Sequence, residues 1–117
     1  RQTPLIRSQE RACVRLKNAM QAGRSQHCSA GLAGAVSSLS PGRIPHRWDD
    51  LAAIETPTLL VSGSEDPKYS HLAERMQLEF KSARILTLEG VGHAPHIEAP
   101  NETSLGIRQF LSMLSPQ

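Results

Sequence analysis

The feature that most constrains the fold is an alternation of short apolar runs and amphipathic helix patterns in the second half of the chain. Thr58–Ser62 and Arg84–Leu88 are short runs typical of buried parallel strands. Between them, apolar residues recur at helical spacing, and Pro67 suits the first turn of that helix. After a loop over 89–99, Pro100 begins a last helix. This order predicts an α/β fold with a parallel sheet.

Each predicted helix of this half carries one apolar face. The face of the first helix consists of Tyr69, Leu72, Ala73, Met76 and Phe80. The face of the last helix consists of Ile107, Phe110, Leu111 and Leu114. Two strands leave a sheet edge without a partner, and such an edge requires a further strand. We therefore expect this half to be the end of a larger sheet.

The first part of the chain predicts helices and loops without strands. Apolar residues at spacings of three and four predict helices over 8–22, where Gly23 is the expected stop, and over 29–39. The second of these helices would carry Leu32, Ala35, Val36 and Leu39 on one face. Residues 40–47 have the composition of a loop, and Trp48–Ala53 predicts a short helical turn.

Positive charge is concentrated in the first part. Residues 1–47 hold eight lysines and arginines against one acidic residue, whereas residues 48–117 hold five against ten. A basic segment attracts anionic ligands, although solvated helix faces also explain most of these arginines. Nucleic acid binding usually brings stacking aromatics or a known motif, and neither is present in the sequence. No apolar run is long enough to cross a bilayer. We expect an anionic small molecule as partner, with no nucleic acid and no membrane.

Two side chains that can carry chemistry follow the predicted strands. Asp66 comes just after the first strand and His93 just after the second. Because parallel strands end at the same edge of a sheet, we expect the two side chains to lie close together. A carboxylate beside an imidazole selects its tautomer and supports a general base. Considered alone, Asp66 has a simpler explanation as the N-cap of the helix that Pro67 begins.

The loop that contains His93 also contains His96 and Glu98. Two histidines three residues apart can be metal ligands, but no third ligand is spaced to join them, so no metal site is predicted. We expect Glu98 to form hydrogen bonds within this loop.

A set of short motifs resembles the C-terminal signature of the α/β-hydrolases: Pro57–Gly63 (PTLLVSG), Asp66, Gly92-His93, Glu98 and Pro100. In that family the triad order along the chain is nucleophile, acid, histidine, so the resemblance assigns the acid to Asp66 and the histidine to His93. It covers roughly residues 56–114. Thr103 stands where the family commonly has a large apolar residue, which predicts weaker local packing.

A narrower resemblance concerns the synthases that make 2-succinyl-6-hydroxy-2,4-cyclohexadiene-1-carboxylate and release pyruvate in menaquinone and phylloquinone biosynthesis. Their loops read D-x-K-[FY] and G-H-A-x-H-x-E, which match Asp66–Tyr69 and Gly92–Glu98. Gly42–Leu51 is similar to the stretch that leads out of their helical cap. The resemblance implies contacts to substrate for Trp48, Lys68 and His96, whose alternative roles are structural.

The resemblance implies a lyase in which Asp66 orients His93 and His93 activates a serine. Residues 1–55 would be a helical cap segment and linker, and residues 56–117 the C-terminal part of the hydrolase core. No G-x-S-x-G nucleophile elbow occurs, and the chain begins with Arg1 rather than Met. We therefore expect a fragment whose nucleophile lies in an N-terminal half upstream. No metal or organic cofactor is implied.

Two alternatives stay open. One is a generic α/β-hydrolase that acts on an ester, an epoxide or a haloalkane, and the other is a non-catalytic remnant or binding module. The paired loop motifs favour the synthase.

The only two cysteines, Cys13 and Cys28, indicate free thiols in a reducing compartment. We expect a cytoplasmic location, or a plastid in a photosynthetic eukaryote.

Overall fold

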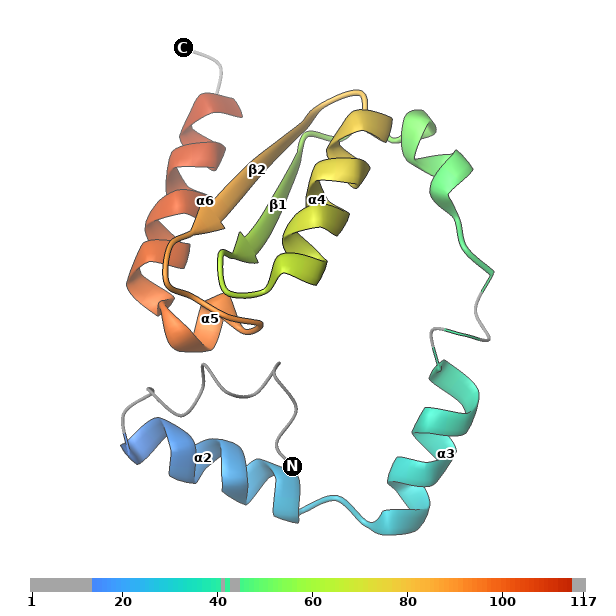
Figure 1. Cartoon of the computed structure of the whole chain (residues 1–117), viewed down its shortest axis with the longest axis vertical. Coiled ribbons are helices and arrows are strands. Elements are labelled where there is room, and N and C mark those ends of the chain that lie inside the picture. Colours follow the sequence, from blue (N-terminus) through green and yellow to red (C-terminus); the bar gives the residue numbers. More distant parts are fainter. Residues whose placement is uncertain (1–13, 41, 43–44, 115–117) are drawn as a thin grey trace. The chain divides into compact units, whose positions relative to one another are not determined.

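The structure is a computed structural model that describes residues 14–40, 42 and 45–114. Figure 1 shows these elements in chain order: helices α2 (Val14–Ser25) and α3 (Ser29–Leu39), the 3₁₀ helix η2 (Trp48–Ala53), strand β1 (Thr58–Gly63), helix α4 (Pro67–Glu79), strand β2 (Ala83–Leu88), and helices α5 (Pro95–Glu98) and α6 (Pro100–Leu114). The described residues form two compact units, one ending at Arg47 and the other beginning at Trp48.

In the unit that begins at Trp48, β1 and β2 form a parallel two-stranded sheet whose register runs from Thr58 opposite Ala83 to Gly63 opposite Leu88. Helices α4 and α6 lie on opposite sides of this sheet (Figure 1). The predicted order of strand, helix, strand and helix is therefore confirmed. The strands are less buried than expected, because a sheet of two strands leaves the side chains of residues 58–61 half-buried.

Helix α6 faces the sheet through a different set of residues from the predicted one. Its buried residue is Thr103, and Gly106 lies so close to β2 that an added Cβ would overlap Leu86 Cδ2. Of the predicted inner face, only Phe110 is half-buried. The other three members are exposed: Ile107, Leu111 and Leu114. The prediction was wrong here because the narrow sheet covers a single row of α6 side chains, and close approach at a glycine selects that row.

Helix α4 follows its predicted pattern more closely. Ala73 is buried, and three further members of the predicted face are half-buried: Leu72, Met76 and Phe80. Tyr69, the first member, is exposed instead. It lies in the first turn of α4, directly after the loop that follows β1.

The unit that ends at Arg47 contains α2 and α3. Helix α3 matches its predicted bounds, and the Cys28 thiol caps it by accepting a hydrogen bond from the Gly31 N–H at 3.2 Å. Helix α2 extends through Gly23, the residue predicted to end it, and residues 8–13 of that prediction lie outside the described part of the chain. Pro41 in the predicted loop is likewise not described.

The apolar face predicted for α3 is not buried, since Leu32, Val36 and Leu39 are all exposed. None of the helices in the described ranges combines the length and the hydropathy required of a membrane span.

Candidate active site

The ends of β1 and β2 bring two loops together at one edge of the sheet. Three backbone N–H groups connect the loops: Ser64 donates to the Leu88 carbonyl at 2.9 Å, Glu65 to the Val91 carbonyl at 2.9 Å, and Gly90 to Ser64 Oγ at 2.9 Å. Gly90 has a φ of 68°, a conformation that favours glycine. The parallel register places the two loops side by side, and these hydrogen bonds determine their relative position.

Gly63 permits the close approach of the two loops. A Cβ on this residue would overlap the backbone carbonyl oxygens of Val91 and Gly92. Ser70 on α4 adds a further connection, because its hydroxyl donates to the Gly63 carbonyl at 3.1 Å. Glycine at the end of β1 is therefore required by packing against backbone, which cannot move aside as a side chain can.

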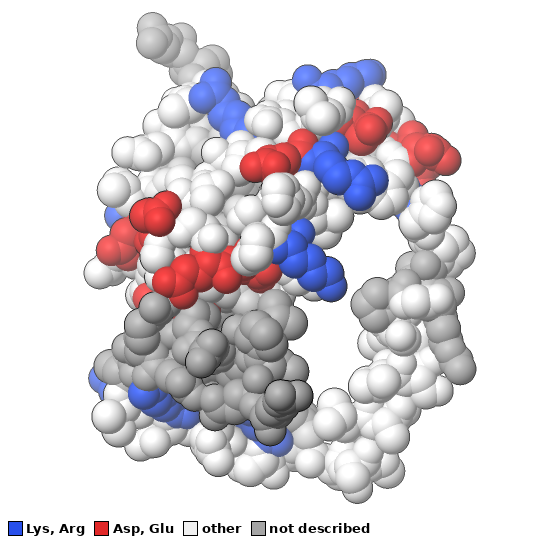
Figure 2. Space-filling view, viewed as in Figure 1, with Lys and Arg blue, Asp and Glu red and all other residues white. Residues whose placement is uncertain are grey.

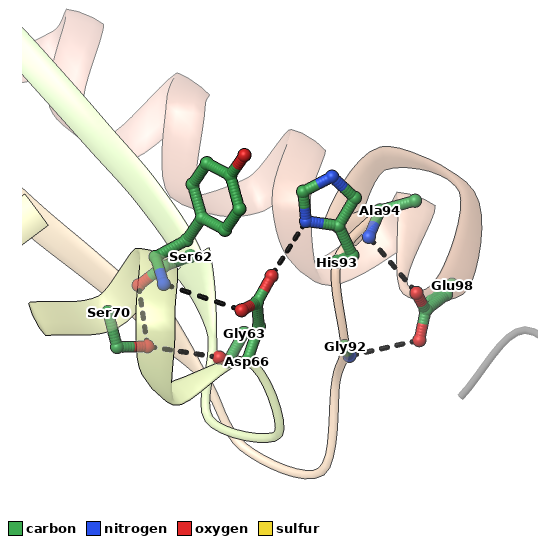
Figure 3. A network of polar contacts seen from close by, with 9 residues as sticks. Ser62, Gly63, Asp66, Ser70, Gly92, His93, Ala94 and Glu98 are labelled. Atoms are coloured by element: carbon green, nitrogen blue, oxygen red, sulfur yellow. Dashed lines mark hydrogen bonds and ion pairs between the residues drawn. The ribbon is translucent and has the colours of Figure 1, made fainter. Parts of the chain in front are cut away.

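Asp66 and His93 meet where these loops meet. The carboxylate Oδ2 of Asp66 lies 2.6 Å from Nδ1 of His93 (Figure 3). The Asp66 side chain is 6% exposed and that of His93 is 40% exposed. Because an ionised carboxylate only accepts hydrogen bonds, Nδ1 is the donor, and the lone pair of the imidazole is then on Nε2. The pair therefore has the geometry of an acid and a histidine that can act as a base.

Asp66 is also the N-cap of α4, as the simpler interpretation of its position predicted. Its other oxygen, Oδ1, lies 3.3 Å from the backbone N–H of Tyr69 in the first turn of α4. One carboxylate thus caps α4 and binds His93. The two interpretations of Asp66 do not exclude each other, because its two oxygens have different partners.

Glu98 orders the backbone on either side of His93. Its two carboxylate oxygens accept from the N–H of Gly92 at 2.9 Å and from the N–H of Ala94 at 3.0 Å (Figure 3). Hydrogen bonds to a charged acceptor are stronger than those between neutral groups. The expectation that Glu98 bonds within its own loop is confirmed, and its effect is to orient the peptide groups that carry His93.

Helix α5, which the sequence did not predict, lies in this loop. Thr103 connects it to α6: the buried hydroxyl lies 3.0 Å from the Pro95 carbonyl and 2.7 Å from the Ala99 carbonyl. The expectation that Thr103 weakens local packing was therefore wrong, because its side chain is 7% exposed and hydrogen-bonded. The hydroxyl connects the loop that carries His93 and Glu98 to the long helix behind it.

Tyr69 lies at this site, whereas the sequence analysis placed it on the apolar face of its helix and in the Asp66–Tyr69 motif without a role beside His93. Its ring lies beside that of His93, with centroids 4.7 Å apart and planes tilted by 56°. Lys68 places its ammonium group 5.4 Å from the centroid of the Tyr69 ring. The signal that could have indicated the contact with His93 is the spacing of Tyr69: it lies three residues after an N-cap aspartate, in the first turn of α4.

The three side chains predicted to contact substrate lie in different places. Lys68 is exposed, and its ammonium group lies over the ring of Tyr69. His96 is exposed on α5. Trp48 is half-buried, and its ring contacts the guanidinium group of Arg75 at 5.0 Å. Arg75 lies six positions after Tyr69 in the helix, or roughly 9 Å along the axis, so this contact lies farther along α4.

Neither the charges nor the ligand-type side chains indicate another kind of site. Among the residues that the structure describes, no three histidine, cysteine or acidic side chains cluster as metal ligands would. Figure 2 shows acidic and basic side chains interspersed over the elements from Trp48 onward. On this face the described residues form no continuous basic surface of the kind that nucleic acid binds.

Comparison with known proteins identifies the fold family. The sequence profile described as the alpha/beta hydrolase family matches residues 7–104. The chain belongs to the alpha/beta hydrolase family. The parallel strands, the helices on both sides and the positions of Asp66 and His93 after successive strands agree with membership in this family.

Several members of the family are similar to this chain. A Bacillus subtilis protein named as a 2-succinyl-6-hydroxy-2,4-cyclohexadiene-1-carboxylate synthase is 27% identical over 95% of this chain and 40% of its own length. Protein PHYLLO, chloroplastic, of Arabidopsis thaliana is 35% identical over 69% of this chain and 5% of its own length. A rat protein named as the protein-lysine deacylase ABHD14B is 35% identical over 56% of this chain and 31% of its own length.

A solved structure extends the similarity to three dimensions. MenH from S. aureus superimposes with a TM-score of 0.92 at 26% identity, and the match covers 96% of this chain and 42% of that one. The alpha/beta hydrolase fold is therefore shared over nearly the whole of this chain. The chain spans about two fifths of the length of the Bacillus subtilis relative and of MenH.

Proposed function

We propose that this chain supplies the acid and the histidine of a synthase that forms 2-succinyl-6-hydroxy-2,4-cyclohexadiene-1-carboxylate and releases pyruvate. The observation that carries the proposal is the 2.6 Å hydrogen bond between Asp66 and His93. The Bacillus subtilis relative that is named for this synthesis matches 95% of the length of this chain.

His93 acts as the base through Nε2 in this proposal. His93 accepts the proton of a serine hydroxyl, and Asp66 stabilises the imidazolium that forms. The serine oxygen removes a proton from the substrate, and the electrons of that C–H bond form a new double bond and break the C–O bond to the enolpyruvyl group. The imidazolium gives its proton to the leaving enolate, which becomes pyruvate, so His93 and the serine return to their starting protonation states. Glu98 contributes indirectly by orienting the two peptide groups beside His93.

The substrate of such a synthase carries several carboxylates, which favours cations near the base. Lys68 contacts the ring of Tyr69, which lies beside His93, and we propose it as a contact for one carboxylate. His96 on the same loop as His93 is proposed as a second contact. Trp48 is proposed to line the pocket farther along α4.

The nucleophile and the donors of an oxyanion hole are proposed to lie in polypeptide outside these 117 residues, in an N-terminal half of the hydrolase fold. The absence of a G-x-S-x-G elbow from the sequence supports this assignment. We propose residues 1–55 as cap segment and linker and residues 56–117 as core. Since PHYLLO is named as chloroplastic, we propose a plastid location in a photosynthetic eukaryote and a cytoplasmic one elsewhere.

A chimaera tests the proposal directly. This chain replaces the matched segment of the Bacillus subtilis relative, and pyruvate release is followed with a lactate dehydrogenase couple. We expect activity that falls by a factor of about 10³ or more in His93→Ala, because the base is lost. A folded chimaera that releases no pyruvate would contradict the proposal. The intact mass of the polypeptide in the cells that make it tests separately whether an upstream half is present.

Hydrolysis of an acyl group is the second candidate, and the similarity to ABHD14B favours it. An aspartate and a histidine can activate a serine for acyl transfer as readily as for elimination. The same chimaera, given a p-nitrophenyl acyl ester, would then release p-nitrophenol without forming pyruvate. If a folded chimaera forms neither pyruvate nor p-nitrophenol, that result would favour a non-catalytic binding role.

A further inference from the structure

Tyr69 contacts both members of the Asp66–His93 pair. Its backbone N–H lies 3.3 Å from Asp66 Oδ1 and 3.1 Å from the Asp66 carbonyl oxygen, so it is shared between the two acceptors. Its ring lies 4.7 Å from the ring of His93. The backbone of Tyr69 therefore contacts Asp66, and its ring contacts His93. The relative position of these two side chains determines whether His93 can act as a base.

The hydrogen bond to Asp66 leaves one motion of His93 unrestrained. It determines the position of Nδ1, but the imidazole plane can still tilt about the line that joins Nδ1 to Oδ2. Such a tilt moves Nε2, the atom that must meet a proton donor. With its side chain 40% exposed, His93 lacks the dense packing that would prevent the tilt. The ring of Tyr69 is the aromatic neighbour found for it among the described residues, in a tilted geometry that aromatic pairs favour.

We propose that the aromatic ring of Tyr69 is a positioning element for His93: it restricts the tilt of the imidazole and thereby the direction of Nε2. This inference rests on the proposed function in one respect, that His93 acts as a base. The aromatic ring of Tyr69 positions the imidazole, and the phenolic hydroxyl of Tyr69 takes no part in this positioning. Lys68, whose ammonium lies over the same ring, stabilises its orientation through a cation–π contact.

The side chain of Tyr69 can be altered without changing the hydrogen bonds of its backbone. Tyr69→Phe keeps the ring, Tyr69→Leu keeps much of the volume without the ring, and Tyr69→Ala removes both. All three variants keep the N–H that approaches Asp66 Oδ1. Leu78→Ala on the same helix is the matched control, because Leu78 is 84% exposed.

Proton NMR of the 117-residue chain reports the position of the imidazole without any catalytic assay. The proton on Nδ1, hydrogen-bonded to a carboxylate, gives a low-field resonance that is identified by its absence from His93→Gln. We expect Tyr69→Ala and Tyr69→Leu to accelerate exchange of this proton with water at least tenfold. Tyr69→Phe should restore slow exchange, and Leu78→Ala should not change it. Equal exchange rates in all four variants, with the fold intact by amide spectra, would overturn the proposal.

Kinetics of the chimaera provide the second readout. Misdirection of a base lowers the rate of the chemical step more than it weakens substrate binding, so kcat should fall by about ten- to a hundredfold in Tyr69→Leu with little change in KM. An increase in KM alone would instead assign Tyr69 to substrate binding and overturn the positioning role. If the parent chimaera forms no pyruvate, the proposed synthase function fails while the NMR result still decides the role of Tyr69.

Discussion

The two compact units of this chain contain helices with very different surroundings. In the unit from Trp48 onward, Ala73, Val91, Ala94 and three polar side chains are buried, and loops distant in sequence share hydrogen bonds. In the unit ending at Arg47, helix α3 has no buried residue, although its leucines and Val36 recur at helical spacing. Helical periodicity predicts where a helix forms. Whether its apolar face is buried depends on what packs against it.

The same difference applies to glycine. Gly63 is required because backbone carbonyls occupy the space where a Cβ would lie. At Gly34 in α3, by contrast, no described atom beyond the adjoining helix backbone lies within 4 Å of that position. Substitutions that are chemically alike should therefore have opposite effects in the two units. The following predictions test this comparison, from the largest expected effect to the smallest.

Gly63→Ala should destabilise the unit from Trp48 onward by about 3 kcal/mol or more, because the overlap is with backbone on the adjoining loop. Gly34→Ala should instead stabilise α3 by about 0.5–1 kcal/mol, because alanine loses less conformational entropy in a helix. Urea denaturation followed by circular dichroism measures both. Similar effects of the two substitutions would contradict the distinction between the units.

Glu98→Gln should destabilise the loop around His93 by about 1–2 kcal/mol. A glutamine has one acceptor oxygen in place of two, so the N–H of Gly92 or of Ala94 loses its partner. Amide hydrogen exchange should show faster exchange at these two positions. Glu102→Gln is the control, since this glutamate is exposed on α6, and unchanged exchange at both loop amides in Glu98→Gln would refute the assigned role.

Thr103→Val should destabilise the contact between α5 and α6 by about 1 kcal/mol. The substitution keeps the shape and removes the hydroxyl that lies near the Pro95 and Ala99 carbonyls. The cost is modest because both carbonyls also accept backbone hydrogen bonds. Thermal unfolding measures it, and a stabilised valine variant would restore the original expectation that an apolar residue suits this position better.

Val36→Ala on α3 should change the free energy of unfolding by no more than about 0.5 kcal/mol, because the side chain is 63% exposed and alanine favours helix. The same urea titration checks it. A loss above about 1 kcal/mol would mean that α3 buries this face against a surface, and the contrast between the units would then be smaller than the structure indicates.

Much of the fold and of the candidate site was predictable because it depends on local pattern. Pro67 after an apolar run locates the start of α4, and Asp66 and His93 follow successive strands whose ends must share an edge. The inner face of α6 was not predictable in this way. Ile107 and Leu111 lie on one helical stripe, and Thr103 and Gly106 lie on another that fits the helical spacing equally well. Only the closeness of Gly106 to Leu86 shows that the stripe with Thr103 and Gly106 faces the sheet.

The sequence by itself determined the order of β1, α4, β2 and α6, the parallel pairing and the two residues of the Asp66–His93 pair, because these follow from periodicity and from chain order along a sheet. Only the tertiary structure decided that Glu98 binds both amides beside His93, that the Thr103 hydroxyl connects α5 to α6, and that the ring of Tyr69 lies against the imidazole. Such contacts depend on distances and angles between elements, which spacing along a chain does not specify.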